Sequence, residues 1–261
     1  MIDSTSQVAL VTGATKGIGL AVTEKLASEG MRVFLCARSA DDVADTTKRL
    51  RERGMTVDGT TCDVTSAGEV DTLVGSAVDR FGRLDVLVNN AGRSGGGVTA
   101  DLTDQLWLDV INTNLNSVFY ASRAVLTTGG MMARGSGRII NIASTGGKQG
   151  VVLGAPYSAS KHGVVGFTKA LGLELAKTGV TVNAVCPGYV ETPMAAQVRA
   201  NYARIWKISE DEVLARFNAK IPLGRYTRPE EVAGMVHYLA TPAAAAITAQ
   251  AVNVCGGLGN Y

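Results

Sequence analysis

The sequence contains few of the residues that build disulfide frameworks and metal sites. There are four cysteines, Cys36, Cys62, Cys186 and Cys255, and two histidines among 261 residues. The cysteines are widely spaced and form no Cys-x-x-Cys pair, so we expect neither a disulfide framework nor a zinc site. Free cysteines fit a reducing compartment, and we therefore expect a cytoplasmic protein.

The sequence also has only a small excess of positive charge and few long hydrophobic runs. The 25 basic and 23 acidic residues leave a net charge of +2, and no cluster of five or more like charges occurs. A nucleic-acid-binding protein needs a concentrated basic face, so this class is excluded. Residues 1–7 contain no Lys or Arg, and the apolar run at 8–11 is short, so the sequence predicts neither a signal peptide nor a membrane anchor.

The composition instead favours a large folded core. Hydrophobic residues make up 46% of the chain and charged residues 18%, and short β-rich runs alternate with longer helical patterns, which indicates βαβ units. We expect one domain over residues 1–261, built as a doubly wound, seven-stranded parallel sheet with helices on both faces. Its strands are expected at residues 8–12, 32–37, 57–62, 84–89, 138–143, 180–185 and 249–254.

One stretch is longer than a normal connection between elements. It covers residues 193–222, follows the sixth expected strand, and contains Tyr202, Trp206 and Phe217. Long connections without a place in the sheet are often functional. We expect this stretch to be a mobile lid over a substrate site.

A glycine-rich turn follows the first expected strand. It reads Thr12-Gly13-Ala14-Thr15-Lys16-Gly17-Ile18-Gly19 and opens the first helix. A strand, a tight turn and a helix N-terminus bring backbone N–H groups and the positive end of the helix dipole against a pyrophosphate. The spacing Gly-x3-Gly-x-Gly differs from the general Gly-x-Gly-x2-Gly fingerprint, and the position after a strand is what indicates dinucleotide binding.

Four polar residues form a candidate catalytic group. Tyr157 and Lys161 are four residues apart, which places them on one face of a helix. A free tyrosine has a pKa of about 10, and a nearby ammonium is expected to lower it. Ser144 ends the fifth expected strand, at the edge where parallel sheets bind ligands, and Asn114 lies in the fourth expected helix.

These segments together resemble the short-chain dehydrogenase/reductase family, which has a Rossmann-like fold. The glycine turn resembles its TGxxxGxG motif, residues 89–92 its NNAG motif and residues 187–192 its PGxxxT motif. The resemblance implies that Ser144 and Tyr157 bind a carbonyl oxygen and that Tyr157 gives it a proton. It also implies that Lys161 binds the nicotinamide ribose and that Asn114 holds a water that resupplies the proton.

The resemblance also implies the residues that bind a nicotinamide dinucleotide. NAD-binding folds carry a carboxylate at the end of the second strand, whereas this chain has Arg38 there and Lys16 in the glycine turn. Two cations suit a 2′-phosphate, so we expect NADPH. The expected cofactor-binding residues are Thr12, Gly13, Thr15, Lys16, Gly17, Ile18, Gly19, Arg38, Asp63, Val64, Asn90, Ala91, Gly92, Tyr157, Lys161, Pro187, Gly188, Val190 and Thr192.

The loops around the catalytic group further resemble the ketoreductases of type II aromatic polyketide synthases. That subfamily reduces one ketone of a poly-β-ketone held on an acyl carrier protein and works as a homotetramer. Its Pro-Gly-Gly motif stands here as Ser94-Gly95-Gly96, which puts the stereochemical preference in doubt. The expected substrate-binding residues are Ser94, Gly95, Gly96, Thr145, Gln149, Val151, Leu153, Met194, Tyr202 and Trp206.

An acidic carrier protein would need a locally basic surface. Six cations belong to segments expected at the edge of the cleft, namely Arg38, Arg93, Lys148, Arg199, Arg204 and Lys207. Other functions stay open at this point: a fatty-acid β-ketoacyl-carrier-protein reductase, and an alcohol dehydrogenase acting on free ketones. A redox-sensing module that binds NADPH without turnover is a third, although it would not need Ser144, Tyr157 and Lys161 together.

Overall fold

A single parallel sheet forms the centre of the computed structural model, which describes residues 7–259 and 261. Its strand order is β3-β2-β1-β4-β5-β6-β7, and all six neighbouring pairs are parallel. This confirms the doubly wound sheet with seven strands. The strands are β1 (Val8–Thr12), β2 (Arg32–Ala37), β3 (Val57–Thr61), β4 (Val86–Asn89), β5 (Gly137–Ile142), β6 (Val180–Pro187) and β7 (Ala251–Val254).

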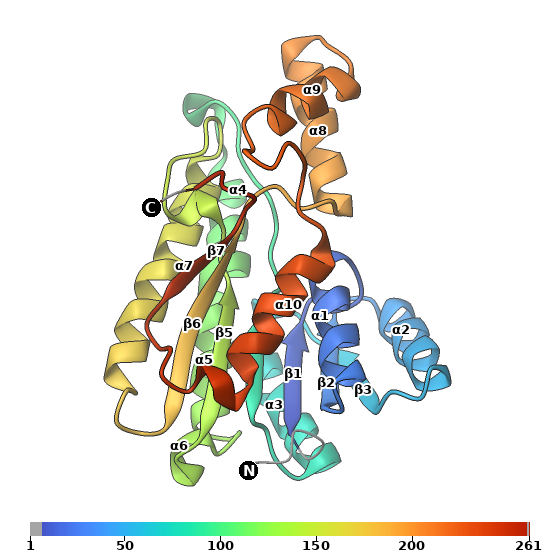
Figure 1. The fold of residues 1–261 in the computed structure, drawn as a ribbon, viewed down its shortest axis with the longest axis vertical. Helices are drawn as coiled ribbons and strands as arrows, with labels where there is room; N and C mark the ends of the chain where they lie inside the picture. Colours follow the sequence, from blue (N-terminus) through green and yellow to red (C-terminus); the bar gives the residue numbers. More distant parts are fainter. Residues whose placement is uncertain (1–6, 260) are drawn as a thin grey trace.

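Helices cover both faces of the sheet, as expected (Figure 1). The α-helices are α1 (Gly17–Ser28), α2 (Ala40–Glu52), α3 (Ala67–Phe81), α4 (Asp104–Ile111), α5 (Ser117–Leu126), α6 (Met131–Arg134), α7 (Ala155–Glu174), α8 (Pro193–Trp206), α9 (Glu210–Asn218) and α10 (Pro229–Ala240). None of the helices described is both long and apolar enough to cross a membrane. The prediction that the N-terminal segment is neither a signal peptide nor a membrane anchor concerns mainly residues 1–6, which lie outside the described residues.

Two apolar cores hold these helices on the sheet. Side chains of α1, α2 and α10 pack in one cluster, and α1 lies against α10. Side chains of α3, α5 and α7 pack on the opposite face in the other. The central strands alternate between these two clusters, so Val11 faces one core and Leu10 the other. A strand covered on both faces is nearly all apolar, which is why such strands could be predicted from the sequence.

The chain reverses its winding direction between β1 and β4. β1 pairs with β2 on one side and with β4 on the other, so the connection from β3 to β4 crosses the sheet. Ligands of such sheets bind beside this switch point, outside the carboxyl ends of the strands. Because all strands are parallel, the segments that follow each strand meet at one edge, and the expected site residues lie in those segments.

The expected lid, residues 193–222, contains two helices rather than an irregular loop. Thr192 caps α8 by accepting from Ala195 N, and Ser209 caps α9 in a reciprocal capping box with Glu212. A separate apolar cluster, which includes Val213 and Phe217 of α9 and Tyr226 beyond it, holds the two helices together. The pair stands at the top of Figure 1, beyond the sheet.

Candidate active site

The glycine turn between β1 and α1 is shaped by close contacts. Gly13 and Gly17 have φ of 63° and 56°, in the left-handed region that glycine adopts without strain. A Cβ on Gly13 would lie 2.9 Å from the Ala91 Cα, and one on Gly19 would lie 2.3 Å from the Gly13 carbonyl oxygen. The turn therefore has no room for side chains at these positions.

The segment after β4 holds this turn in place through hydrogen bonds. Asn90 Nδ2 donates to the carbonyl oxygens of Thr12 and Gly13, each at 2.9 Å. The Thr12 hydroxyl accepts from the backbone N–H groups of Asn90 and Ala91, each at 3.0 Å. Asn89 extends the support across the sheet by donating to Asn141 Oδ1 at 2.8 Å. The structure thus brings the two expected cofactor motifs together.

The chemistry of the turn fits a dinucleotide polyanion. Lys16 precedes α1, and no side chain caps the first N–H groups of this helix, so they are free for an anion. Ala14 N donates to Cys36 O at 3.0 Å, which brings the end of β2 beside the turn. Arg38 follows two residues later, and both Arg38 and Lys16 are exposed. Among the described residues neither forms an ion pair, so both charges are available to a phosphate.

The remaining expected cofactor residues also lie along this edge. A Cβ on Gly17 would lie 3.3 Å from Thr192 Cγ2, so the segment after β6 reaches the glycine turn. The Asp63 carboxylate accepts from the backbone N–H of Thr65 at 2.9 Å, which fixes the turn into α3. The Val64 side chain is 8% exposed and packs in the core.

Ser144 and Tyr157 meet beyond the end of β5. Strand β5 ends at Ile142, so Ser144 lies two residues past it rather than at its end, and its hydroxyl accepts from Gly146 N at 2.9 Å. A Cβ on Gly146 would lie 3.3 Å from Ser144 Oγ and 3.2 Å from Tyr157 Cε1, so the two side chains are neighbours. A carbonyl oxygen placed between the two hydroxyls would receive two hydrogen bonds.

Lys161 lies beneath the phenol and is almost fully buried, with 5% of its surface exposed. Its ammonium donates to Ile142 O at 2.8 Å and stands 6.0 Å from the centroid of the Tyr157 ring. Burial lowers the pKa of Lys161 to about 8.

The pKa of Tyr157 does not follow the direction expected from its lysine neighbour. Burial of the phenol raises this pKa above the usual value, and the hydrogen bond with Ser144 opposes the rise without cancelling it. The expectation that Lys161 lowers the pKa of Tyr157 was therefore wrong for this structure, because desolvation disfavours the charged phenolate. The phenol stays protonated at neutral pH, which is the form that donates a proton.

Asn114 lies within a π-helical turn, Asn112–Asn116, between α4 and α5, and it is fully buried. Its amide group donates to Arg93 O at 3.0 Å and to Ser160 Oγ at 3.1 Å, and it accepts from Arg93 N at 2.8 Å. A Cβ on Gly92 would lie 3.3 Å from Asn114 Oδ1 and 3.7 Å from Lys161 Nζ, so Asn114 and Lys161 are neighbours. Its side chain ties the segment after β4 to α7.

Two loops that carry expected substrate residues are joined to each other. Gly97 N donates to Leu153 O at 2.8 Å, and a Cβ on Gly96 would lie 2.0 Å from the same oxygen. Leu153 itself has φ of 59°, unusual for a residue with a side chain. Segment 94–97 and segment 149–154 therefore form one continuous wall.

The helix α8 reaches this wall. The Tyr202 hydroxyl donates to Val152 O at 3.1 Å, and the Tyr202 ring contacts those of Trp206 and Phe217 at 4.7 and 5.3 Å between centroids. Met194 is 39% exposed near the start of α8, Gln149 is exposed, and Thr145 is buried. Trp206 lies 5.9 Å from Phe217, so its ring supports the helix pair.

The six cations expected at the edge of the cleft differ in their surroundings. Arg93 pairs with Asp109 at 2.7 Å, and Arg199 pairs with Glu191 at 2.8 Å. Lys148 turns inward, so the expectation of a surface charge was wrong there: its ammonium donates to Ala251 O at 2.7 Å and to Asn253 Oδ1 at 2.9 Å. Arg38, Arg204 and Lys207 are exposed. No sequence signal marked the role of Lys148, because its partners lie more than 100 residues away.

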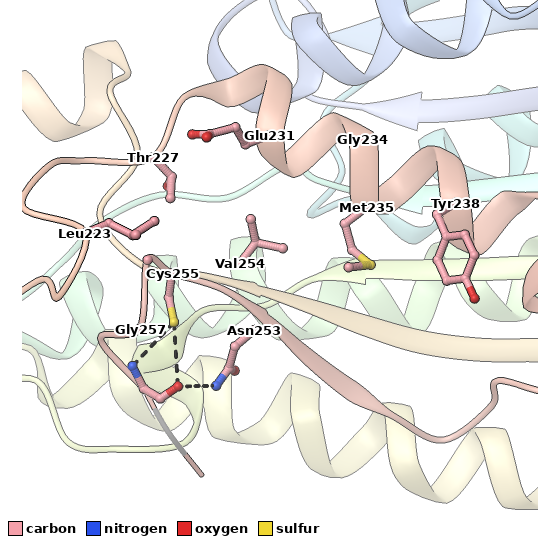
Figure 2. A pocket seen from close by; sticks show the side chains of 12 residues that line it. Leu223, Thr227, Glu231, Gly234, Met235, Tyr238, Asn253, Val254, Cys255 and Gly257 are labelled. Atoms are coloured by element: carbon pink, nitrogen blue, oxygen red, sulfur yellow. Dashed lines mark hydrogen bonds between the residues drawn. The ribbon is translucent and has the colours of Figure 1, made fainter.

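One hollow on the described surface lies apart from the catalytic group. It has a volume of about 540 Å³ and lies between α10, β7 and the segment after β7 (Figure 2). None of the expected site residues lines it. Its lining residues are Leu223, Thr227, Glu231, Gly234, Met235, Tyr238, Asn253, Val254, Cys255, Gly256, Gly257 and Gly259.

Comparisons with known proteins agree with this geometry. The family model for short chain dehydrogenases matches residues 7–203. The chain is 68% identical to a Streptomyces virginiae protein named as a ketoacyl reductase of the monensin polyketide synthase, and 64% identical to a ketoacyl reductase named in Streptomyces coelicolor, over 261 residues and all of both chains. It is 43% identical to a 3-oxoacyl-[acyl-carrier-protein] reductase of Synechocystis over 260 residues, 99% of each.

One solved structure is similar to this chain in three dimensions as well as in sequence. It is a crystal structure of a variant of the actinorhodin polyketide ketoreductase with NADPH. The TM-score is 0.96 and the identity 64%, and the match covers all of both chains.

Proposed function

Because this chain belongs to the short-chain dehydrogenase family, we propose that it is an NADPH-dependent ketoreductase of aromatic polyketide biosynthesis. Its substrate is a poly-β-ketone held on an acyl carrier protein, of which it reduces one ketone to an alcohol. The geometry that carries the proposal is the meeting of the Ser144 hydroxyl, the Tyr157 phenol and the buried Lys161 ammonium at the edge that also holds the glycine turn.

The residues at this edge have separate chemical tasks. Ser144 and Tyr157 hydrogen-bond the carbonyl oxygen, where negative charge develops during reduction. The Tyr157 hydroxyl then gives its proton to that oxygen, as a general acid. NADPH, when bound, supplies the hydride to the carbonyl carbon. Lys161 holds the nicotinamide ribose and stands under the phenol that loses the proton.

Asn114 completes this arrangement on the side of Lys161. The proposal keeps the expectation that it holds a water which resupplies the proton through Lys161. Both side chains approach the same point beside Gly92, which supports a short path between them.

The uncapped N-terminus of α1 would hold the pyrophosphate, and Arg38 with Lys16 would hold the 2′-phosphate. We expect Arg38→Ala to weaken NADPH binding by about tenfold to a hundredfold, since a charge-assisted hydrogen bond contributes roughly 1.5–3 kcal/mol. NADH, which has no 2′-phosphate, should bind the variant and the wild type equally. Fluorescence titration with both cofactors measures the change.

The matched control for this measurement is Lys48→Ala, which removes an exposed charge from α2. Its affinity for NADPH should equal that of the wild type. An equal loss of NADH affinity in Arg38→Ala would contradict a role at the 2′-phosphate.

The identities to the named relatives favour a polyketide substrate over a fatty-acid substrate. Those named for polyketide or ketoacyl reduction are 64% and 68% identical to this chain, whereas the 3-oxoacyl-carrier-protein reductase is 43% identical. The wall of segments 94–97 and 149–154, together with Met194, Tyr202 and Trp206 of the α8–α9 lid, offers mixed polar and apolar surfaces. A cleft of this kind suits a bulky, partly cyclised chain.

One experiment separates this function from fatty-acid reduction. The purified protein and NADPH are mixed with decalone, a saturated bicyclic ketone, and separately with an acetoacetyl thioester, free and on a carrier protein. Faster oxidation of NADPH with the bicyclic ketone is expected. Faster turnover of the acetoacetyl substrates would favour the fatty-acid function, and no turnover of any ketone would contradict an enzyme.

A carrier protein would bind near the mouth of the cleft. The exposed cations Arg204 and Lys207 remain available there for an acidic partner. Reaction in the cytoplasm, where NADPH is abundant and the four cysteines stay reduced, fits this partner.

The proposal includes a homotetramer. Trp107 and Leu108 of α4 and Phe119 of α5 are 42%, 49% and 44% exposed, and we assign these apolar side chains to a first face. The free edge of β7 and the neighbouring α10, with Leu223 and Tyr238, form a second. Two different self-complementary faces on one chain build a closed dimer of dimers.

Phe119→Glu is expected to break the tetramer into dimers, because a carboxylate would be buried in the first face without a partner. Sedimentation velocity measures the change in mass. The control Met132→Glu alters a residue of α6 with similar exposure, 45%, outside both faces, and should stay tetrameric. A wild-type monomer at micromolar concentration would contradict the proposal.

A further inference from the structure

The segment that carries Ser144 is a short buried turn. The 3₁₀ helix Thr145–Gly147 follows Ser144 directly, and Lys148 is the first residue after it. Gly147 N donates to Ser144 O at 2.9 Å, and Lys148 N donates to Thr145 O at 3.0 Å. The backbone of Lys148 is therefore fixed relative to Ser144.

One side of this turn touches the helix that carries the other two catalytic residues. A Cβ on Gly146 would lie 3.2 Å from Tyr157 Cε1, and one on Gly147 would lie 2.5 Å from the Lys161 carbonyl oxygen. The turn is thus pressed against α7, and a shift of the turn would change the distance between the Ser144 and Tyr157 hydroxyls.

The other side of the turn is held by Lys148. Its ammonium donates to Ala251 O at 2.7 Å, to Asn253 Oδ1 at 2.9 Å and to Tyr261 O at 3.3 Å, which uses its three donors. It also stands 5.7 Å from the centroid of the Tyr261 ring. These bonds connect the turn to the last strand and to the segment that follows it.

The partners of Lys148 belong to the free edge of the sheet. The Gln250 and Val254 carbonyls accept from Ala184 N and Gly188 N of the β6 side. By alternation the Ala251 carbonyl faces away from β6, where the described part of the chain places no further strand beyond β7. Lys148 supplies the donor that a neighbouring strand would have supplied.

Asn253 passes this restraint on to the segment after β7. Its Nδ2 donates to Gly259 O at 2.9 Å, and Gly259 N donates to Cys255 Sγ at 3.3 Å (Figure 2). The Ser144 turn is thus linked through Lys148 to residues 251–259 and to Tyr261.

We propose that Lys148 is a positioning residue, whose ammonium clamps the Ser144 turn to the outer edge of β7 and so fixes the Ser144 hydroxyl against Tyr157. The proposal rests on the ketoreductase function proposed above. Lys148 acts through Ser144 and touches neither carbonyl nor cofactor. Loss of the clamp costs turnover, because a catalytic group displaced by a fraction of an ångström binds the transition state less well.

The test compares Lys148→Met in two backgrounds, with NADPH and decalone. In the wild-type background kcat is expected to fall by about tenfold, whereas the NADPH affinity changes by less than about twofold. In a Ser144→Ala background the same change should lower kcat by less than about twofold, because the group that Lys148 positions is gone. A general loss of folded protein would lower kcat equally in both.

Asn253→Ala is the second variant, and it removes one acceptor of the clamp while leaving Lys148 in place. It is expected to lower kcat by a smaller factor and with the same dependence on Ser144. The matched control is Lys169→Met, an exposed lysine of α7, which should leave kcat unchanged.

The outcomes separate the two proposals. A wild-type protein that does not oxidise NADPH with decalone would overturn the ketoreductase function. An active wild type whose Lys148→Met and Asn253→Ala variants match it, or lose the same factor with and without Ser144, would overturn the positioning role alone.

Discussion

Tyr157→Phe is expected to lower the turnover of decalone by about a thousandfold, within the 10²–10⁴ range of a lost general acid. The phenol is the general acid of the proposed mechanism, and burial, which raises its pKa, keeps it protonated. The ring itself remains, so the packing against Gly146 is preserved. NADPH affinity and the melting temperature should change little. Steady-state kinetics, a cofactor titration and thermal unfolding measure the three quantities.

The control for this variant is Tyr238→Phe, which removes a phenol hydroxyl from α10, where the ring is 42% exposed. Its turnover should match that of the wild type. A Tyr157→Phe protein that keeps most of its activity would show that another group supplies the proton.

Gly19→Ala is expected to weaken NADPH binding by about a hundredfold or more. The added Cβ would lie 2.3 Å from both the Gly13 carbonyl oxygen and Asn90 Nδ2. A backbone oxygen cannot move alone, so the glycine turn must shift and its N–H groups no longer converge on the pyrophosphate. The loss corresponds to about 2.7 kcal/mol of binding free energy. Isothermal titration with NADPH measures it.

Gly75→Ala is the matched control, since Gly75 lies within the helix α3 and a Cβ there meets nothing within 4 Å. This change should leave NADPH affinity intact and raise the stability by up to about 1 kcal/mol, because alanine favours the helix. An equal affinity in Gly19→Ala and Gly75→Ala would show that the turn does not hold the pyrophosphate.

The amino-acid sequence by itself determined the parts of this protein that depend on local spacing. The apolar strands, the turn at residues 12–19, and the four-residue interval between Tyr157 and Lys161 each follow from a short run of residues. Strands covered on both faces and motifs that follow strands leave a clear pattern. For the same reason the expected β1 and β2 have the bounds that the structure gives them.

Only the tertiary structure decided the features that depend on burial and on distant partners. The pKa of Tyr157 rises because the phenol loses water, which the lysine four residues away did not reveal. Lys148 points toward β7 because its ammonium donates to the Ala251 carbonyl, 103 residues away, on the outer side of an edge strand. Residues 193–222, the expected lid, contain two helices that pack around an aromatic cluster with Phe217. Each of these results from packing between segments far apart in the chain, and no local pattern of residues encodes such packing.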